Sequence, residues 1–250
     1  MISVCMATYN GEKYIEEQVR SILPQLAEND ELIVSDDGST DRTLEILENF
    51  KDNRIKIFHH NKNEVKIPFY LGSKATDNFY FAAKNFENAL AKAQGDYIFL
   101  SDQDDVWLPD KIEKTIPYLN KDTLVISDAW IVNENMEKQC KLSEFVNYKK
   151  GFWKNILIKG APYGCLCAFT KNIKFFLLPI PKNVLTHDFW LSLISELQFS
   201  SAYISEPLVL YRRHTNTVSK TNISRNSIFF IIRYRTFMLY ECLKRYYSKK

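Results

Sequence analysis

Residues 97–107 read YIFLSDQDDVW, an apolar run followed by three aspartates within four positions. The apolar part, residues 97–101, is typical of a buried strand, because a strand covered on both faces lacks polar alternation. Before it, expected strands alternate with expected helices: strands at residues 2–6, 32–35 and 54–59, and helices at residues 12–26, 43–50 and 79–93. This order predicts right-handed βαβ units and an α/β domain whose mainly parallel central sheet carries helices on both faces.

The alternation loosens beyond residue 109. We expect a polar and aromatic connection with little regular structure over residues 135–160. The other expected elements are a helix at 110–119, strands at 124–128, 165–170 and 208–211, a helix at 186–196 and a C-terminal helix at 224–247. Nothing in the composition resembles a linker, so we expect one domain over residues 1–218. Residues 219–250 are expected to form a basic, amphipathic helical extension.

The composition is that of a folded globular chain. Its 250 residues are 46% hydrophobic and 25% charged, which excludes disordered and low-complexity classes. The longest apolar runs, such as residues 228–232, are far shorter than a membrane-spanning helix. The apolar segment at residues 2–7 has no basic region before it, unlike a secretory signal. Five cysteines without CxxC spacing argue against a disulfide framework and a zinc site, so we expect a cytoplasmic protein.

The net charge of +3 is unevenly distributed. Residues 212–250 hold 10 Lys and Arg residues and one acid, which leaves 23 basic and 29 acidic residues elsewhere. This asymmetry indicates an anionic partner, a phospholipid surface or a phosphorylated substrate, with a merely solvated helix as the alternative. The apolar and basic C-terminal helix fits peripheral association with the inner face of the cell membrane. It equally fits packing on the domain or dimerisation. We expect no nucleic-acid partner.

Polar clusters follow three of the expected strands, at residues 8–10, 36–39 and 102–105. Open parallel sheets bind ligands at the carboxyl ends of their strands, so these clusters are expected to form one site. Carboxylates this close repel unless a cation offsets them, and hard oxygen ligands suit Mg²⁺ or Mn²⁺ that also holds phosphate oxygens. The alternative, acids at a helix N-terminus, explains Asp110 better than Asp102 or Asp104.

Asp36 and Asp37 allow two interpretations. They fit a turn before a helix, and they also fit acceptors for a base or ribose, as in dinucleotide-binding folds. The chain contains neither GxGxxG nor GxxxxGK[ST], which argues against a dehydrogenase and a P-loop enzyme. We therefore expect a nucleotide to be held by a different set of contacts.

The motifs MATYNG (residues 6–11), VSDDGSTD (34–41) and LSDQDDVW (100–107), in this order, resemble those of family 2 glycosyltransferases. That family has the GT-A fold, also called the nucleotide-diphospho-sugar transferase fold. The DQDD form is similar to the rhamnosyltransferase-type branch. The resemblance continues through residues 164–165, 186–190 and 211–214, and so covers about residues 1–218.

The resemblance implies inverting transfer of a sugar from dTDP-rhamnose or a UDP-hexose to a glycan or lipid-linked glycan during surface polysaccharide synthesis. It implies Asp188 as the base, although an acid at a helix start would look the same. The residues implied around the nucleotide are Thr8, Tyr9, Asn10, Asp36, Asp37, Asp102 and Gln103. Those implied for the metal are Asp102 and Asp104. Those assigned to the acceptor or sugar are Asp105, Trp107, His187 and Trp190, of which both tryptophans fit a buried core equally well.

Arg212, Arg213 and His214 follow the last expected strand. Guanidinium groups suit phosphate geometry and imidazole can ligate a metal, so we expect the arginines on the diphosphate and His214 on the metal. A surface basic cluster is the alternative. Two other functions stay open. A nucleotidyltransferase normally has a glycine-rich basic loop near its first strand, where this chain has Asn10, Gly11 and Glu12. A non-catalytic nucleotide-sugar-binding protein would not need Asp102, Asp104 and Asp188 together.

Overall fold

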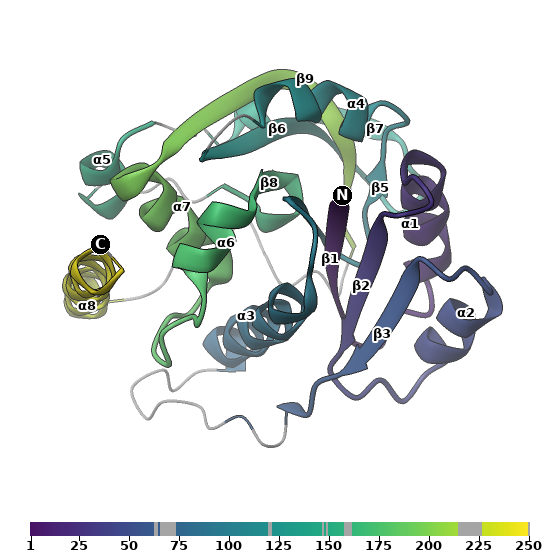
Figure 1. The fold of residues 1–250 in the computed structure, drawn as a ribbon, viewed down its shortest axis with the longest axis horizontal. Coiled ribbons are helices and arrows are strands. Elements are labelled where there is room, and N and C mark those ends of the chain that lie inside the picture. The colour runs from purple at the N-terminus through teal and green to yellow at the C-terminus, as the bar shows by residue number, and fades with distance from the viewer. Residues whose placement is uncertain are drawn as a thin grey trace.

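The computed structural model describes residues 1–62, 65, 74–119, 122–146, 148, 150–157, 162–214 and 227–249. Within them, nine strands form a single sheet that curls around helix α3 (Figure 1). The path through eight of them is β3-β2-β1-β4-β8-β6-β9-β5, and β7 pairs with β6.

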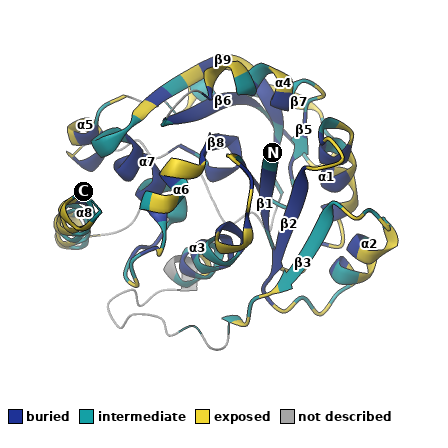
Figure 2. Ribbon diagram, in the orientation of Figure 1, coloured by how far each residue is buried: buried dark blue, intermediate teal, exposed yellow. Residues whose placement is uncertain are grey.

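The first four strands are the parallel half of the sheet. They are β1 (Ile2–Thr8), β2 (Glu31–Asp36), β3 (Ile55–His59) and β4 (Tyr97–Ser101). The register pairs Thr8 with Asp36 and Asp36 with His59, so these strands end at one edge. Their apolar runs are buried on both faces in β2 and nearly so in β1 and β4 (Figure 2). The four predicted strands are confirmed.

The second half of the sheet is mixed. Strand β8 (Cys167–Thr170) runs antiparallel to both β4 and β6 (Thr123–Val132), whereas β9 (Ser200–Arg212) runs parallel to β6. The short β5 (Val106–Trp107) and β7 (Lys138–Lys141) add antiparallel pairs. The prediction of a mainly parallel sheet therefore holds through β4, and the remainder is mixed. Strand β5 brings the residues that follow the DQDD motif beside the end of β9.

Helices cover both faces of the parallel half, as predicted (Figure 1). Helix α3 (Lys74–Lys92) packs on β1 and β2 through Phe86 and Leu90. Helices α1 (Ile15–Ile22) and α2 (Thr43–Asn49) lie on the other side, and α1 buries Ile15, Val19 and Ile22. Their spacing of three and four residues gives one apolar face. Helix α1 ends at Ile22 and is followed by a 3-10 turn, η1 (Leu23–Gln25), which contains Pro24.

The second half of the chain carries shorter helices. The predicted helix at 110–119 is α4 (Lys111–Thr115) followed by the 3-10 turn η3 (Ile116–Tyr118). The connection over 135–160 is more regular than expected, since it contains β7, η4 (Leu142–Glu144) and α5 (Phe152–Leu157). The remaining helices are η5 (Gly164–Leu166), α6 (Lys171–Leu177), α7 (His187–Gln198) and α8 (Ile228–Ser248).

Helix α8 packs on α5 and α7. Met238 and Cys242 are fully buried on its inner face, and the Arg245 guanidinium donates to the backbone oxygens of residues 176, 178 and 179. Packing on the domain, one of the expected alternatives, therefore accounts for one face of this helix. Residues 219–226, the start of the predicted extension, lie outside the described residues. No described helix combines the length and apolar character needed to cross a bilayer. All five cysteines are free, as expected.

Gly95 marks a close approach between the end of α3 and strand β1. A Cβ atom at this position would lie 2.6 Å from the backbone nitrogen of Ser3 and 2.8 Å from the carbonyl carbon of Ile2. We predict that Gly95→Ala lowers the free energy of unfolding by about 1–3 kcal/mol, because two backbone segments must separate. Urea unfolding measures this loss. Ala91→Ser, on the exposed side of α3, is the control and should change stability by less than about 0.5 kcal/mol.

Candidate active site

Asp36 organises the loop after β2. Its carboxylate accepts hydrogen bonds from the Thr8 hydroxyl at 3.0 Å, from the Gly38 and Ser39 backbone N–H groups at 3.0 and 2.8 Å, and from the Ser39 hydroxyl. The Asp36 side chain is fully buried. Both carboxylate oxygens are thus used inside the protein, and the geometry gives Thr8 and Asp36 a role in shaping the loop in place of the predicted nucleoside contact.

Asp37 pairs with His60, a residue that the sequence analysis missed. The Asp37 Oδ1 atom lies 2.5 Å from Nδ1 of His60, and the His60 backbone N–H donates to the Asp36 carbonyl at 2.7 Å. His60 directly follows β3, the same position relative to a strand that the three polar clusters occupy. Nearby, Tyr9 is half-exposed, with the Lys62 ammonium 3.1 Å from its ring centroid. These groups leave a polar and aromatic surface beyond β1, β2 and β3.

Gln103 joins the DQDD segment to the loop after β1. It accepts from the Tyr9 N–H at 2.9 Å and donates to the Tyr9 carbonyl at 3.1 Å. A Cβ atom on Gly11 would lie 2.4 Å from Oε1 of Gln103, so this contact requires glycine there. Asn10 has φ 48° and accepts from the Thr40 N–H at 2.9 Å. Gln103 and Asn10 thus fix the two loops relative to each other, although both were predicted to contact the nucleotide.

Asp102 and Asp105 lie with Cys165 in one cluster, where their ligand atoms are within 4.8 Å of one another. Burial, the charge of Asp104 and the charge of Asp188 raise the pKa of Asp102 to about 7, against a hydrogen bond from the Cys165 thiol that lowers it. Asp188 therefore lies close enough to Asp102 for their charges to interact. The site concentrates negative charge in a poorly hydrated place, which fits a cation.

Asp105 is a buried member of this cluster. Its side chain is fully buried, and Oδ1 accepts the Arg212 backbone N–H at 3.1 Å. Burial first, then the charges of Asp104 and Asp102, raise its pKa well above the ordinary value. The predicted contact of Asp105 with acceptor or sugar is not compatible with this burial. Asp105 instead anchors the end of β9 under the DQDD segment.

Asp104 and His214, both expected as metal ligands, lie next to each other. The distance between Oδ2 of Asp104 and Nε2 of His214 is 2.8 Å. The His214 ring also contacts Tyr14, with 4.8 Å between ring centroids. A carboxylate and an imidazole at this distance, next to Asp102, are a donor set that suits Mn²⁺ and, through the carboxylates, Mg²⁺.

The two neighbouring arginines have different surroundings. Arg212 is only 3% exposed, pairs with Glu17, donates to the carbonyls of Asp104 at 2.9 Å and Glu134 at 3.2 Å, and stacks on Tyr14. Its donors are committed to the protein, so the predicted diphosphate contact of Arg212 is wrong.

Arg213 presents the opposite case. Its Nε and Nη2 atoms are buried and have no hydrogen-bond partner among the residues described. Burial is the main cause that raises the pKa of Tyr163, and the Arg213 charge acts against that rise. Asp188 also acts on Tyr163, so Arg213 and Asp188 lie near the same ring. A buried guanidinium with free donors fits an anionic ligand.

Asp188 lies in the first turn of α7. It is half-buried, and its Oδ1 atom accepts the Phe189 N–H at 2.7 Å. His187 stacks on Phe86 with 4.1 Å between centroids, and burial lowers its pKa, which favours the neutral ring. A Cβ atom at residue 164 would lie 2.5 Å from Nε2 of His187, so Gly164 leaves space for this imidazole.

Trp107 and Trp190 belong to the hydrophobic core, with exposed fractions of 2% and 0%. The Trp190 indole N–H donates to the Leu177 carbonyl at 2.9 Å. The prediction that either ring stacks on a sugar is therefore wrong, and the alternative of core packing holds for both.

Known proteins similar to this chain indicate its family. The profile of the family described as Glycosyl transferase family 2 matches residues 3–68 and 75–175. The dTDP-rhamnosyl transferase RfbG of Shigella flexneri is 32% identical over 239 residues, covering 88% of this chain and 75% of RfbG. The Escherichia coli UDP-Glc:alpha-D-GlcNAc-diphosphoundecaprenol beta-1,3-glucosyltransferase WfgD is 28% identical over 225 residues, covering 88% of this chain and 79% of WfgD.

Solved structures share the fold. S. aureus TarS 1–349 in complex with UDP-GlcNAc has a TM-score of 0.64 at 18% identity, covering 99% of this chain and 72% of TarS. The mannosyltransferase PcManGT from Pyrobaculum calidifontis, in complex with GDP-Man and Mn2+, has a TM-score of 0.53 at 18% identity, covering 85% of this chain and 56% of PcManGT. The resemblance drawn from the three motifs is confirmed: the fold is GT-A, and the chain belongs to the family 2 glycosyltransferases.

Proposed function

We propose that this glycosyltransferase inverts the anomeric configuration of the transferred sugar in a single displacement, with Asp188 as the general base. The observation that carries the proposal is the charge coupling between Asp188, at the start of α7, and Asp102, at the end of β4. Single displacement needs one base on the acceptor side of the sugar and compensation of charge on the leaving-group side. Asp188 supplies the first, and the groups around Asp102 supply the second.

The leaving diphosphate would lie between Asp102, Asp104 and Arg213. Asp102 and Asp104 with His214 would hold a Mg²⁺ or Mn²⁺ ion, because the carboxylates otherwise carry unbalanced charge at partial burial. When bound, that ion offsets the charge of the departing diphosphate. Arg213 would donate its free N–H groups to phosphate oxygens. The Mn2+ bound with GDP-Man in PcManGT supports this use of a divalent ion.

The donor is proposed to be a uracil or thymine nucleotide sugar. Asp37 is 4% exposed and pairs with His60 through Oδ1, so its other carboxylate oxygen is the acceptor proposed for the base. The half-exposed ring of Tyr9 is suited to stacking on that base. Uracil and thymine both present a ring N–H to such an acceptor. The names of RfbG and WfgD support dTDP-rhamnose and UDP-glucose respectively, and the TarS complex supports a UDP-sugar.

The acceptor is proposed to be a glycan carried on a lipid diphosphate, as in surface polysaccharide synthesis. The name of WfgD supports this, since it specifies a sugar on diphosphoundecaprenol. The acceptor hydroxyl would donate its proton to Asp188. His187, neutral and stacked on Phe86, would hold the start of α7 in position.

Replacement of the base should separate chemistry from binding. We predict that Asp188→Asn lowers kcat by at least about 100-fold, the lower scale of general-base effects, while donor affinity stays within about threefold. Steady-state transfer assays measure kcat, and calorimetry with UDP or dTDP measures the affinity for the nucleotide part of the donor. Asp110→Asn, an acid in the ion pair with Lys114, is the matched control and should keep its turnover. Undiminished turnover in Asp188→Asn would exclude this residue as the base.

The two arginines should respond in opposite ways. Arg213→Gln is predicted to weaken nucleotide diphosphate binding by at least about tenfold and to leave stability unchanged or higher, because the buried Nε and Nη2 groups of this half-buried arginine have no partner among the described residues. Arg212→Gln is predicted to lower the free energy of unfolding by at least about 2 kcal/mol, because several buried hydrogen bonds are lost. Calorimetry measures nucleotide diphosphate binding, and urea unfolding measures the stability of each variant. Equal loss of stability in both variants would contradict the proposed role of Arg213.

Proton competition should make metal binding depend on pH. With the pKa of Asp102 raised to about 7, this carboxyl is mostly protonated at pH 6 and mostly ionised at pH 8. The apparent affinity for Mn²⁺ in the presence of UDP should therefore fall about tenfold from pH 8 to pH 6, with proton uptake from the buffer as the metal leaves. Calorimetry in two buffers measures both effects. If Asp102→Asn keeps the full pH dependence, the competing proton lies elsewhere and this account of Asp102 fails.

A further inference from the structure

Helix α8 is apolar on its solvent-facing side as well as on its packed side. Phe229 and Tyr247 are 82% and 75% exposed. Ile228, at the start of the helix, is also exposed. Five further exposed large apolar side chains recur every three, four or eight positions and so lie along one side of the helix: Phe229, Ile232, Tyr240, Leu243 and Tyr247. We call this line of side chains the α8 stripe. A surface helix normally has polar residues on this side, so the α8 stripe suits a partner that is itself apolar.

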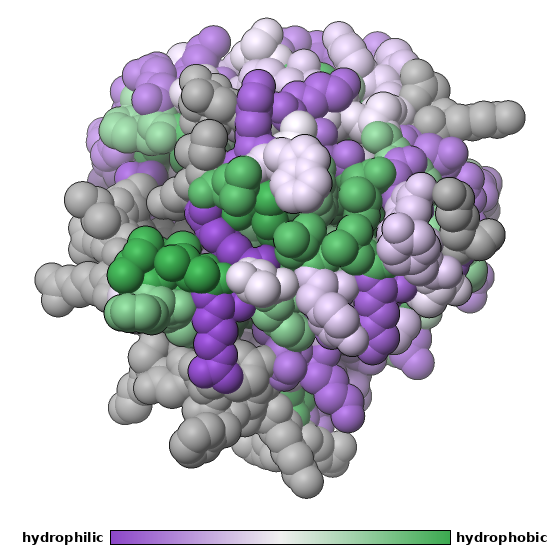
Figure 3. Space-filling model, turned by 90° about the vertical axis from the view of Figure 1, so that its left-hand side faces the viewer, coloured by the Kyte–Doolittle hydropathy of each residue, from purple (hydrophilic) through white to green (hydrophobic). Residues whose placement is uncertain are grey.

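Neighbouring elements extend the apolar surface. Trp153 and Leu157 of α5 are 62% and 66% exposed, and α5 is tied to α8 by a hydrogen bond from the Arg235 guanidinium to the Leu157 carbonyl. Phe175 of α6 is also exposed, and the Lys249 ammonium lies 4.0 Å from its ring centroid. Figure 3 shows apolar patches with hydrophilic side chains between and around them on this side of the molecule. An exposed tryptophan beside aliphatic residues is typical of the interface between water and lipid.

The charge around this surface is predominantly positive. Helix α8 carries four basic residues and one acid, Glu241; Lys249 directly follows the helix, and α5 adds Lys154. Long basic side chains can cover apolar surface with their stems and hold their charge at its border. The rest of the chain is acidic in balance, with 29 acids and 23 bases outside residues 212–250. The positive potential is therefore a local property of this side of the molecule.

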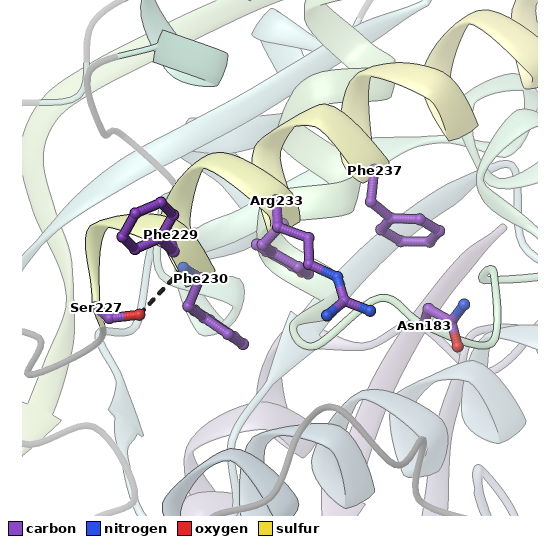
Figure 4. A pocket seen from close by; sticks show the side chains of 7 residues that line it. Asn183, Ser227, Phe229, Phe230, Arg233 and Phe237 are labelled. Atoms are coloured by element: carbon purple, nitrogen blue, oxygen red, sulfur yellow. Dashed lines mark hydrogen bonds between the residues drawn. The ribbon is translucent and has the colours of Figure 1, made fainter.

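The same helix borders the segment that leads to the proposed base. The Leu185 N–H donates to the Tyr234 hydroxyl at 2.9 Å, and the rings of Phe189 and Tyr234 are 6.3 Å apart. A cavity of about 450 Å³ lies here, and Figure 4 shows Phe230, Arg233 and Phe237 projecting from one side of α8 into this region. Tyr234 lies on the side of α8 opposite the α8 stripe, so this helix would separate a surface bound along the stripe from the start of α7.

We propose that the α8 stripe, with Trp153 and Leu157, binds the surface of an anionic phospholipid bilayer. An amphipathic helix of this kind lies in the interface plane, with its apolar side among the acyl chains and its basic residues at the headgroups. A second copy of the chain is a poorer partner, since a two-fold contact would bring two positively charged surfaces together. This binding does not depend on the donor or the reaction.

Vesicle flotation with the full chain tests the proposal. We expect strong binding to phosphatidylcholine vesicles with about 30% phosphatidylglycerol, weak binding to phosphatidylcholine alone, and release at high salt. Leu243→Ser and Tyr247→Ser, exposed and in the half of α8 away from Asp188, should each lower the partition coefficient at least about fivefold. Lys244→Glu should lower it by a similar factor.

Matched controls lie elsewhere on the surface. Tyr118→Ser removes a half-exposed aromatic ring from η3, and Lys51→Glu reverses an exposed charge after α2. Both should bind vesicles like the wild type. Lipid with brominated acyl chains should also quench the fluorescence of Trp153, and Trp153→Phe should remove that quenching. Absence of vesicle binding, equal losses in control and stripe variants, or self-association that Leu243→Ser abolishes would overturn the proposal.

Discussion

Concentrated negative charge at the carboxyl edge of the parallel strands is the constraint around which this molecule is arranged. Asp102, Asp104 and Asp105 follow β4, and Asp188 approaches from α7. The fold offsets part of this charge with the Arg212 backbone N–H on Asp105 and His214 on Asp104. Asp102 stays close to two other carboxylates, and burial, together with their charges, raises its pKa. A divalent ion with a diphosphate would complete this balance in the proposed mechanism.

The polar motifs divide into residues that build the site and residues that are free to contact a ligand. Asp36, Gln103 and Arg212 use their polar atoms on neighbouring backbone, and they hold the loops after β1, β2 and β4 together. Arg213 and Asp188 retain unused donors or acceptors. Preorganisation of this kind favours catalysis, because the groups that stabilise developing charge need not reorganise during the reaction.

Much of the fold could be predicted from the sequence, because β1 to β4 are continuous apolar runs and the helices between them have clear apolar faces. Strand β5 could not, since two residues carry no periodicity, and it is paired by the distant β9. The roles of the site residues were harder to predict from the sequence than the fold. Arg212 is the last residue of β9 and Arg213 follows the strand, so the adjacent arginines were indistinguishable until the end of β9 was known. His60 had a usable signal, its place directly after β3, but a lone histidine gave no reason to select it.

The central claim is that Asp102, Asp104 and His214 hold a divalent ion on the diphosphate while Arg213 contacts its oxygens. Anomalous diffraction at the manganese edge, from crystals grown with Mn²⁺ and UDP or dTDP, tests it most directly. The account predicts a single manganese peak bonded to a carboxylate oxygen of Asp102 or Asp104, with the diphosphate against Arg213. A diphosphate bound away from these carboxylates, or bound beside them with no manganese peak, would contradict it.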